Sequence, residues 1–491
     1  MDIYYQAKLI LFSIIFLIFF LHKKMLTGNV IISFLLFALC LVPNSSVFSD
    51  QRILGSGFKL FNRYIFGLFS IWDIFLIFSL LLIYIKKTRS NFHLDFNLKV
   101  VGIVWGFGLA VGIYNSIIFP YGPTSLRNLV TQSLPIFYFI ASAYLSTKLL
   151  KNSINFVVIY KVLQLCSVII IIEGLIFLIL TTTINLPILR GFGNIPIVVY
   201  DGLAFLNITL LITFDKYTRK LKISTLEVFL FIGSVLFILL STRRMNIAFL
   251  FLNFIFLYFV NSKSIFSGRM ILRMSRDILL IVLPVFAVMY AFSPSLFETF
   301  IFVLKTFNMA SEAGEVSAGF FRIAQIENMF LNMKNYGINS YIHGMGLGTM
   351  WYEFTPLPNL SSEGDAGYIA SLHELGSSGW WPYFHLSNLS TIYRFGFLGA
   401  IIILVFMFRW LYTTIQSMRI DTSVLRSIAM ISALLSFQTV ITLGDSTDAA
   451  WPALCGLLAG ISISLNRIYR LSIAENRYSA AERISMLNTV S

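Results

Sequence analysis

Five arginines lie at or near the ends of apolar segments, where their guanidinium groups could bind an anionic ligand. Arg243 and Arg244 are adjacent in ILLSTRRMNIAF, and the others are Arg127, Arg190 and Arg322. Two neighbouring guanidiniums can bind a diphosphate through charge-assisted hydrogen bonds while an attached lipid tail stays in the bilayer. The alternative interpretation is that the pair only ends a helix at the membrane interface. Together the five charges predict an anionic, lipid-borne substrate.

Three histidines, His343, His373 and His385, share one long polar segment of the sequence. Imidazole titrates near neutral pH, so each could act as the general base that takes a proton from an acceptor hydroxyl. His385 is the first candidate and the other two are its competitors. For each, the alternative is a loop histidine hydrogen-bonded to backbone. Histidine, cysteine and carboxylate residues do not occur at metal-ligand spacing, so we expect no metal and no cofactor.

The sequence YIHGMGLGT, residues 341 to 349, has glycines at alternate positions, Gly344, Gly346 and Gly348. Its flanks, NMKNYGINSY and MWYEFTPLPN, are typical of a loop and lack the strand and helix that a dinucleotide-binding motif requires. The glycines either permit a tight turn or let the backbone approach a bulky substrate closely. The two interpretations are compatible.

Aromatic and acidic residues are frequent around these histidines. Flat amphipathic rings suit both sugar faces and the membrane interface, so Trp380 and Trp381 are predicted acceptor contacts, with an interfacial aromatic belt as the alternative. Nearby rings are Trp351, Tyr352 and Tyr383. The sequence does not rank the acids of this segment, which are Glu312, Glu315, Glu327, Glu353, Glu363, Asp365 and Glu374.

The composition indicates a membrane protein. The chain has 491 residues, of which 57% are hydrophobic and 12% are charged, and its mean hydropathy is +0.83. Apolar runs long enough to cross roughly 30 Å of hydrocarbon recur along it. We therefore predict an all-α polytopic membrane protein with about 12 to 13 transmembrane helices and one large outer loop. The predicted spans are roughly 9 to 21, 30 to 42, 64 to 85, 99 to 118, 129 to 147, 156 to 180, 198 to 214, 226 to 241, 245 to 261, 277 to 293, 392 to 411, 427 to 443 and 451 to 466.

The distribution of lysine and arginine predicts which loops face the cytoplasm. One alternating set of loops carries about 23 of the 36 basic residues and is therefore assigned to the cytoplasm. The net charge of +14 then needs no nucleic acid to explain it. The predicted organisation is N-terminal transmembrane helices over 1–293, a large periplasmic loop over 294–391, C-terminal transmembrane helices over 392–466 and a cytoplasmic tail over 467–491. A soluble nucleotide is not expected at an outer glycine-rich loop.

The order of several short motifs resembles the O-antigen polymerase and O-antigen ligase superfamily. These motifs are LRGFGN before a span, STRR at a hairpin, then FFR, HGMGLG and FHLSNLSTIYRFGFLGA, and together they extend over roughly residues 186 to 405. The resemblance implies a GT-C-like integral-membrane glycosyltransferase that uses polyprenyl-diphosphate-linked sugars. It assigns function to Arg243 or Arg244, to Arg322, to the glycines, and to His385 ahead of the G-x-x-G formed by Gly396 and Gly399.

The resemblance implies a polymerase that joins undecaprenyl-diphosphate-linked repeat units at the outer face of the bacterial inner membrane. A ligase that transfers the glycan to lipid A-core is the alternative, and a lipid-linked oligosaccharide flippase or secondary transporter is a remote one. The chain length and the sequence HLSN, where ligases have H-x-N, favour the polymerase. Expected partners are the lipid-linked glycan donor, the glycan acceptor, membrane lipids and a chain-length regulator, with no nucleic acid.

Overall fold

The structure is a computed structural model that describes part of the chain. The described residues are 10–11, 13–15, 28–41, 63–65, 69–85, 95–118, 126–150, 153–184, 190–192, 195–197, 203–240, 244–261, 272, 274–277, 283, 287, 290, 318–355, 380–381, 387–419, 423–443 and 450–489. For some of these, including the arginines at 127, 190, 244 and 322, only the backbone is described.

Six helices within this described part are long and apolar enough to cross a membrane. They are α5 (Phe96–Ile118), α6 (Leu126–Leu149), α7 (Ser153–Ile184), α16 (Ser387–Met418), α17 (Val424–Thr442) and α18 (Ala450–Thr489). Shorter helices lie beside them: α2 (Gly28–Leu41), α4 (Ile71–Ile85), α8 (Leu203–Thr218), α9 (Thr225–Leu240) and α10 (Arg244–Asn261). The chain is thus an all-α membrane protein with several spans, as the sequence predicts. Eleven of the predicted spans coincide with these helices, whereas the stretches 9–21 and 277–293 lie largely outside the described residues.

Three short antiparallel strand pairs interrupt the helical pattern of the described residues. They pair β1 (Arg63–Ile65) with β2 (Phe69–Ser70), β3 (Arg190–Phe192) with β4 (Ile195–Ile197), and β5 (Trp351–Tyr352) with β6 (Trp380–Trp381). The prediction that a span begins near residue 64 differs from this, since α4 begins at Ile71.

Ser70 and Asp73 explain why α4 begins where it does. The Asp73 carboxylate accepts hydrogen bonds from the Ser70 backbone N–H and hydroxyl, each at 2.7 Å, while the Ser70 hydroxyl oxygen accepts from the Asp73 N–H at 3.2 Å. This reciprocal capping satisfies backbone donors that a new helix leaves without intrahelical partners. It also gives Asp73, an acidic residue in an apolar run, a structural function.

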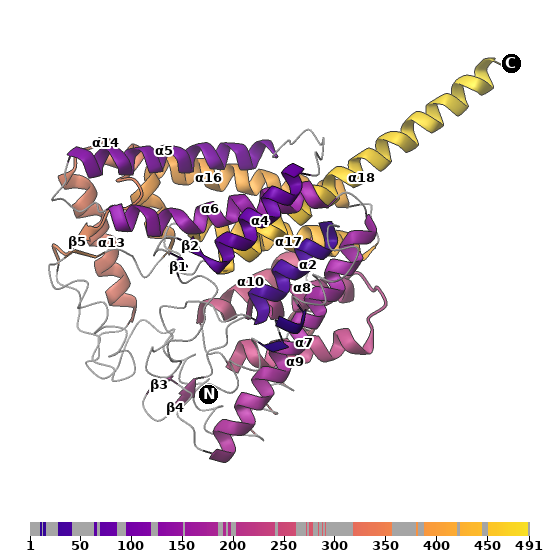
Figure 1. The fold of residues 1–491 in the computed structure, drawn as a ribbon, viewed down its shortest axis with the longest axis horizontal. Coiled ribbons are helices and arrows are strands. Elements are labelled where there is room, and N and C mark those ends of the chain that lie inside the picture. Colours follow the sequence, from indigo (N-terminus) through magenta and orange to yellow (C-terminus); the bar gives the residue numbers. More distant parts are fainter. Residues whose placement is uncertain are drawn as a thin grey trace.

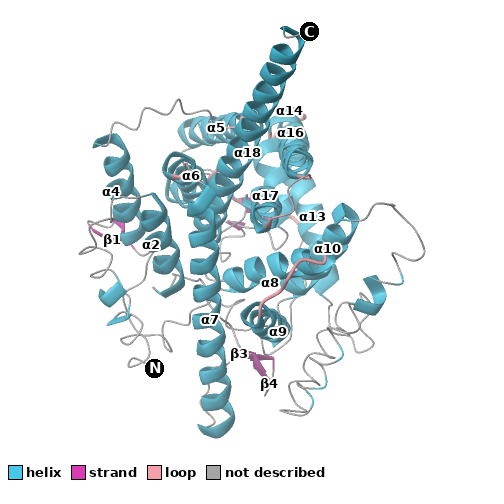
Figure 2. Ribbon diagram, turned by 90° about the vertical axis from the view of Figure 1, so that its right-hand side faces the viewer, coloured by secondary structure: helices cyan, strands magenta, loops and turns pink. Residues whose placement is uncertain are grey.

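Helices α6 and α18 pack closely against each other. A Cβ atom added to Gly456 would lie 2.3 Å from the Phe139 carbonyl oxygen, and one added to Gly460 would lie 2.4 Å from the Ser146 Cβ. Small residues spaced by four allow such close approach of helix backbones in membranes. Figure 2 shows α18 passing between the other helices and then continuing beyond them.

The helix directions place two sets of connections at opposite ends of the bundle. Helix α13 (Ala318–Asn335), helix α14 (Asn339–His343) and β5 gather at one side, and the C-terminal end of α18 lies at the other (Figure 1). At that other end, the α8–α9 turn meets the α16–α17 turn, where an Arg219 guanidinium nitrogen donates to the Ser423 carbonyl oxygen at 3.2 Å. The predicted site residues on α13, α14 and β6 therefore lie at the end of the bundle opposite the α8–α9 and α16–α17 turns.

Candidate functional site

Helix α13, which carries Arg322, holds the end of β5 and the residues after it through two buried asparagines. The Asn332 side chain donates to the Tyr352 carbonyl oxygen and accepts from the Tyr352 N–H, both at 2.7 Å. The Asn328 side chain likewise accepts from the backbone N–H groups of Phe354 and Thr355, at 2.7 and 2.8 Å. The amide groups thus replace a partner strand, and they fix this short extended segment along the helix.

A buried aromatic cluster involves the β5–β6 strand pair. The Trp351 and Trp381 rings are stacked, with centroids 5.8 Å apart and an interplanar angle of 15°. Both are buried, and Trp381 is only 5% exposed; they pack with Met329 and Met333 of α13. This core joins α13 to the strand that leads toward His385.

The two tryptophans of β6 differ in their environment. In the register of the strand pair, Trp381 is opposite Trp351 and Trp380 is opposite Tyr352. Trp381 belongs to the buried cluster, and its indole Nε1 donates to a Glu353 carboxylate oxygen at 2.8 Å. The Trp380 side chain lies outside the described atoms. Sugar binding by either ring stays a prediction.

The predicted glycine-rich loop is a tight turn that follows α14. Gly344, Gly346 and Gly348 have φ angles of 75°, 81° and 86°, a region that side-chain-bearing residues rarely adopt. The His343 Nδ1 donates to the Gly344 carbonyl oxygen at 2.7 Å. We call residues 344–348 the glycine turn.

The glycine turn fills a break in helix α16. The helix is interrupted at Gly396, where φ is 69° and ψ is 175°. The break frees carbonyl groups upstream of it, and the Tyr393 and Arg394 oxygens accept from the backbone N–H groups of Met345 at 2.7 Å and Gly346 at 3.0 Å. In a membrane, such freed carbonyls need protein partners. The turn provides them.

The same turn also packs against α5 and α6. The Leu347 N–H donates to the Gly108 carbonyl oxygen at 3.0 Å, and the Asn115 side-chain amide donates to the Met345 carbonyl oxygen at 2.8 Å. The Gly348 N–H donates to the Gln132 side-chain oxygen of α6. The close backbone approach that the glycines permit is therefore an approach to three helices of this chain. An additional contact with substrate stays a prediction.

Sequence reasoning overlooked Arg394, which lies at the break in α16. Its side chain is 1% exposed and is among the largest fully buried side chains of the described residues. A buried guanidinium within a membrane helix is costly and commonly marks a functional region. The available signal was an arginine inside an apolar run, two residues before a glycine, in the sequence YRFG.

The structure describes the other predicted site residues to different extents: for some it describes the backbone, and others lie outside the described part. Arg127 lies in the first turn of α6, close to Leu129, and a Cβ atom on Gly348 would be 2.8 Å from the Leu129 Cα. Arg322 lies near the start of α13, whose later residues Met329 and Met333 pack with Met345 of the glycine turn. Arg244 begins α10 and Arg190 begins β3. Residues outside the described part are Arg243, His373 and His385.

No protein-family model and no curated protein matches the sequence of this chain. The function of this site must therefore be inferred from its own residues. Within the described residues, no group of three or more histidine, cysteine, aspartate or glutamate side chains gathers as a metal site would require.

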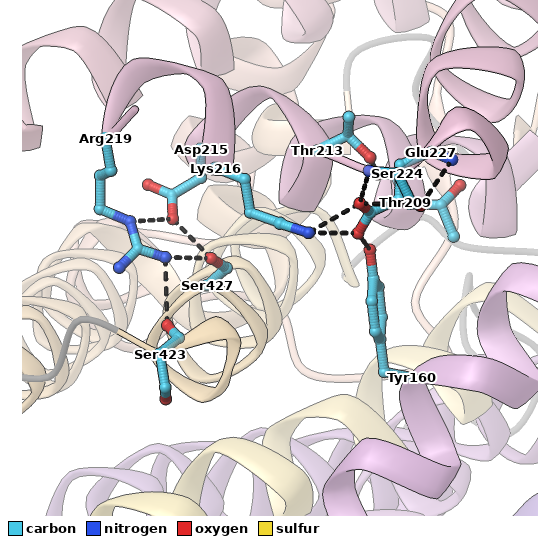
Figure 3. A network of polar contacts seen from close by, with 10 residues as sticks. All are labelled: Tyr160, Thr209, Thr213, Asp215, Lys216, Arg219, Ser224, Glu227, Ser423 and Ser427. Carbon is cyan, nitrogen blue, oxygen red and sulfur yellow. Dashed lines mark hydrogen bonds and ion pairs between the residues drawn. The ribbon is translucent and has the colours of Figure 1, made fainter. Parts of the chain in front are cut away.

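A second polar cluster lies at the opposite end of the bundle (Figure 3). Glu227 accepts from the Lys216 ammonium at 2.6 and 2.7 Å, from the Tyr160 hydroxyl at 2.7 Å and from the Ser224 N–H at 2.8 Å. Ser224 and Glu227 form the capping box of α9, since the Ser224 hydroxyl accepts from the Glu227 N–H at 3.3 Å. The carboxylate thereby connects α7, α8 and α9.

Next to it, Asp215 connects α8, α10 and α17. Its carboxylate is bound by Arg219 at 2.9 Å, by the Ser427 hydroxyl at 2.7 Å and by the Asn261 amide at 2.7 Å. The charges of this cluster have partners from the chain itself. We therefore assign it a structural function, which is to hold five helices together at the end remote from the glycine turn.

Proposed function

We propose that the chain is an integral-membrane glycosyltransferase that joins polyprenyl-diphosphate-linked repeat units into a surface polysaccharide at the outer face of the bacterial inner membrane. The observation that supports this proposal is that elements which carry several of the predicted residues contact one another at one end of the bundle. The glycine turn, the helix of Arg322, the first turn of α6 with Arg127 and the strand of Trp381 all meet there. The motif order that resembles O-antigen polymerases gives independent support.

The proposed chemistry needs a charge-stabilised leaving group and a base. The bond between the anomeric carbon and the diphosphate oxygen breaks, and the electron pair leaves with the polyprenyl diphosphate. Arginines, with Arg243 or Arg244 and Arg322 as candidates, stabilise its charge. A new bond forms between the anomeric carbon and an acceptor hydroxyl oxygen, whose proton passes to His385. Lipid-anchored substrates would meet these groups at the outer membrane surface.

A reconstituted assay tests the proposal. Purified protein in proteoliposomes receives undecaprenyl diphosphate that carries one repeat unit of the source strain's polysaccharide. Release of free undecaprenyl diphosphate together with longer glycans is expected. Movement of the lipid across the bilayer with no bond cleavage would instead establish a flippase and overturn the proposal.

The ligase alternative shares the same donor and differs in acceptor. A deletion strain separates the two activities through the surface glycans that it makes. Loss of the polymerase leaves single repeat units on lipid A-core, whereas loss of the ligase leaves long chains on the undecaprenyl carrier. We expect single repeat units.

A further inference from the structure

The structure singles out Glu353 among the acids of the long polar segment. Glu353 directly follows β5, and one of its carboxylate oxygens accepts the indole N–H of Trp381 at 2.8 Å. Glu327, the other acid of this segment within the described residues, is exposed on α13. The two acids therefore offer a direct comparison between a fixed carboxylate and an exposed one.

The backbone on both sides of Glu353 is held to α13. Asn332 binds the N–H and the carbonyl oxygen of Tyr352, and Asn328 binds the N–H of Phe354. Trp381, which binds the carboxylate, is itself fixed by its stack with the buried Trp351 ring. A side chain that is held in this way loses little conformational entropy when it binds a ligand.

Glu353 is connected both to α13, the helix of Arg322, and to β6, which precedes His385 in the sequence. Trp381 precedes His385 by four residues in the chain, and Asn328 follows Arg322 by six residues on α13. One hydrogen bond thus connects Glu353 to the strand that leads to the predicted base. The asparagines connect its backbone to the helix of the predicted arginine.

Partly exposed rings flank this carboxylate in the sequence. Tyr352 and Phe354 make an edge-to-face contact with centroids 5.1 Å apart, and Phe354 is 44% exposed. Aromatic rings pack against the apolar faces of sugars, and carboxylates accept charge-assisted hydrogen bonds from sugar hydroxyls. The combination of residue types at this strand pair fits a carbohydrate ligand.

We propose that Glu353 binds a hydroxyl group of the acceptor sugar and so orients the acceptor for transfer. This inference rests on the proposed glycosyltransferase function. A carboxylate can accept about four hydrogen bonds, so its bond to Trp381 is compatible with binding a hydroxyl. The Trp381 N–H has the further effect of holding the carboxylate in one orientation.

The decisive variant is Glu353→Gln. Glutamine keeps an oxygen that can accept the Trp381 N–H, and it removes the charge that strengthens a hydrogen bond from a sugar hydroxyl. The probe is the diphosphate-free oligosaccharide of one repeat unit, whose binding is measured by isothermal titration calorimetry. We expect its dissociation constant to rise about tenfold, because a charged hydrogen bond exceeds a neutral one by roughly that factor.

Two further variants serve as controls. Glu327→Gln makes the same charge change on α13 and should leave the dissociation constant unchanged. Trp381→Phe removes the indole N–H and keeps the Glu353 charge, so it should weaken binding less than Glu353→Gln. A purely structural function of Glu353 predicts that Trp381→Phe, which breaks their hydrogen bond, weakens binding at least as much as Glu353→Gln, which keeps it. That result, or no loss in Glu353→Gln, would overturn the inference.

The failure of this inference can be distinguished from failure of the proposed function. If wild-type protein releases undecaprenyl diphosphate but Glu353→Gln binds the oligosaccharide normally, only the assignment of Glu353 is wrong. If wild-type protein neither binds the oligosaccharide nor releases the diphosphate, the glycosyltransferase proposal is wrong and this inference falls with it.

Discussion

The backbone N–H of Gly346 donates a hydrogen bond to the carbonyl oxygen of Arg394, 3.0 Å away, and joins a loop turn to the break in a membrane helix. The bond matters because Arg394 directly precedes Phe395 and Gly396, where α16 stops being helical. A break of this kind is stable only when other groups bind the freed carbonyls. The turn and the break therefore depend on each other.

Gly396→Ala should destabilise the protein strongly. An added Cβ would lie 2.1 Å from the Ile342 carbonyl oxygen, and the residue has a positive φ. Together these effects should cost roughly 2 to 4 kcal/mol. The thermal midpoint in detergent is the measurement. Gly337→Ala is the control, since it also has a positive φ, 94°, but its Cβ would meet no atom within 4 Å. Equal midpoints for the two variants would contradict the proposed dependence.

Arg243→Ala combined with Arg244→Ala should abolish glycan transfer while the protein stays folded. The diphosphate would lose charge-assisted hydrogen bonds worth roughly 1.5 to 3 kcal/mol each. Release of undecaprenyl diphosphate is the readout. Lys220→Ala with Lys222→Ala, two exposed cations at the opposite end, is the matched control and should retain activity. Normal transfer by the arginine double variant would mean that the pair only ends a helix at the membrane interface.

His385→Ala should lower the transfer rate by roughly a hundredfold to ten-thousandfold, as removal of a positioned base does. His343→Ala should have a small effect, because His385 is the assigned base; it is a needed comparison, since the bond from His343 Nδ1 to the Gly344 carbonyl oxygen leaves Nε2 able to accept a proton. His373→Ala completes the comparison. A near-normal rate in His385→Ala, with a large loss in either other variant, would move the base to that histidine.

The wild-type rate should fall below about pH 6. A free imidazole has a pKa near 6.5, and below it the protonated ring can no longer accept the hydroxyl proton. We expect the same activity in the presence of EDTA. A rate that stays constant down to pH 5 would argue against a histidine base.

Asp215→Ala should lower the thermal midpoint far more than Arg276→Ala. The Arg219 and Asp215 side chains are 8% and 0% exposed, so removal of one partner leaves a buried charge, at a cost of about 3 to 5 kcal/mol. Arg276 binds Asp277 but is 62% exposed, and Asp277, which is 7% exposed, keeps the Tyr258 hydroxyl as a donor when Arg276 is removed. We therefore expect a cost near the ~1 kcal/mol that ion pairs with a solvent-exposed partner contribute. Similar midpoints would mean that water reaches the Asp215 cluster.

The membrane spans could be predicted from sequence because hydropathy alone selects helices that cross a bilayer. The start of α4 could not, since it depends on the Ser70 and Asp73 side chains capping a new helix after a short hairpin. The capping box of Ser224 and Glu227 could be predicted from sequence, because Ser-x-x-Glu before an apolar run is a local signal.

The site was predictable only in part. The glycines indicated a tight turn, which Gly344 and Gly346 form. Their partner was not predictable, because the break at Gly396 lies about 50 residues away in sequence and no local pattern joins the two segments. Asn328 and Asn332 also gave no signal, since buried amides that replace a strand have no periodic pattern of their own.

The packing of the glycine turn against α5 has a consequence for the order of assembly during synthesis. A Cβ atom on Gly112 would lie 2.1 Å from the Leu347 carbonyl oxygen, so this face of α5 is shaped for a segment made much later. About 280 residues separate Gly112 from Gly396 in the chain, and at 5 to 20 residues per second a ribosome needs roughly 15 to 60 s to make them. Until α16 emerges, lipid or the insertion machinery must contact the surface of α5 at Gly108 and Gly112. The packing at this end of the bundle is therefore completed late in synthesis, when the C-terminal helices are made.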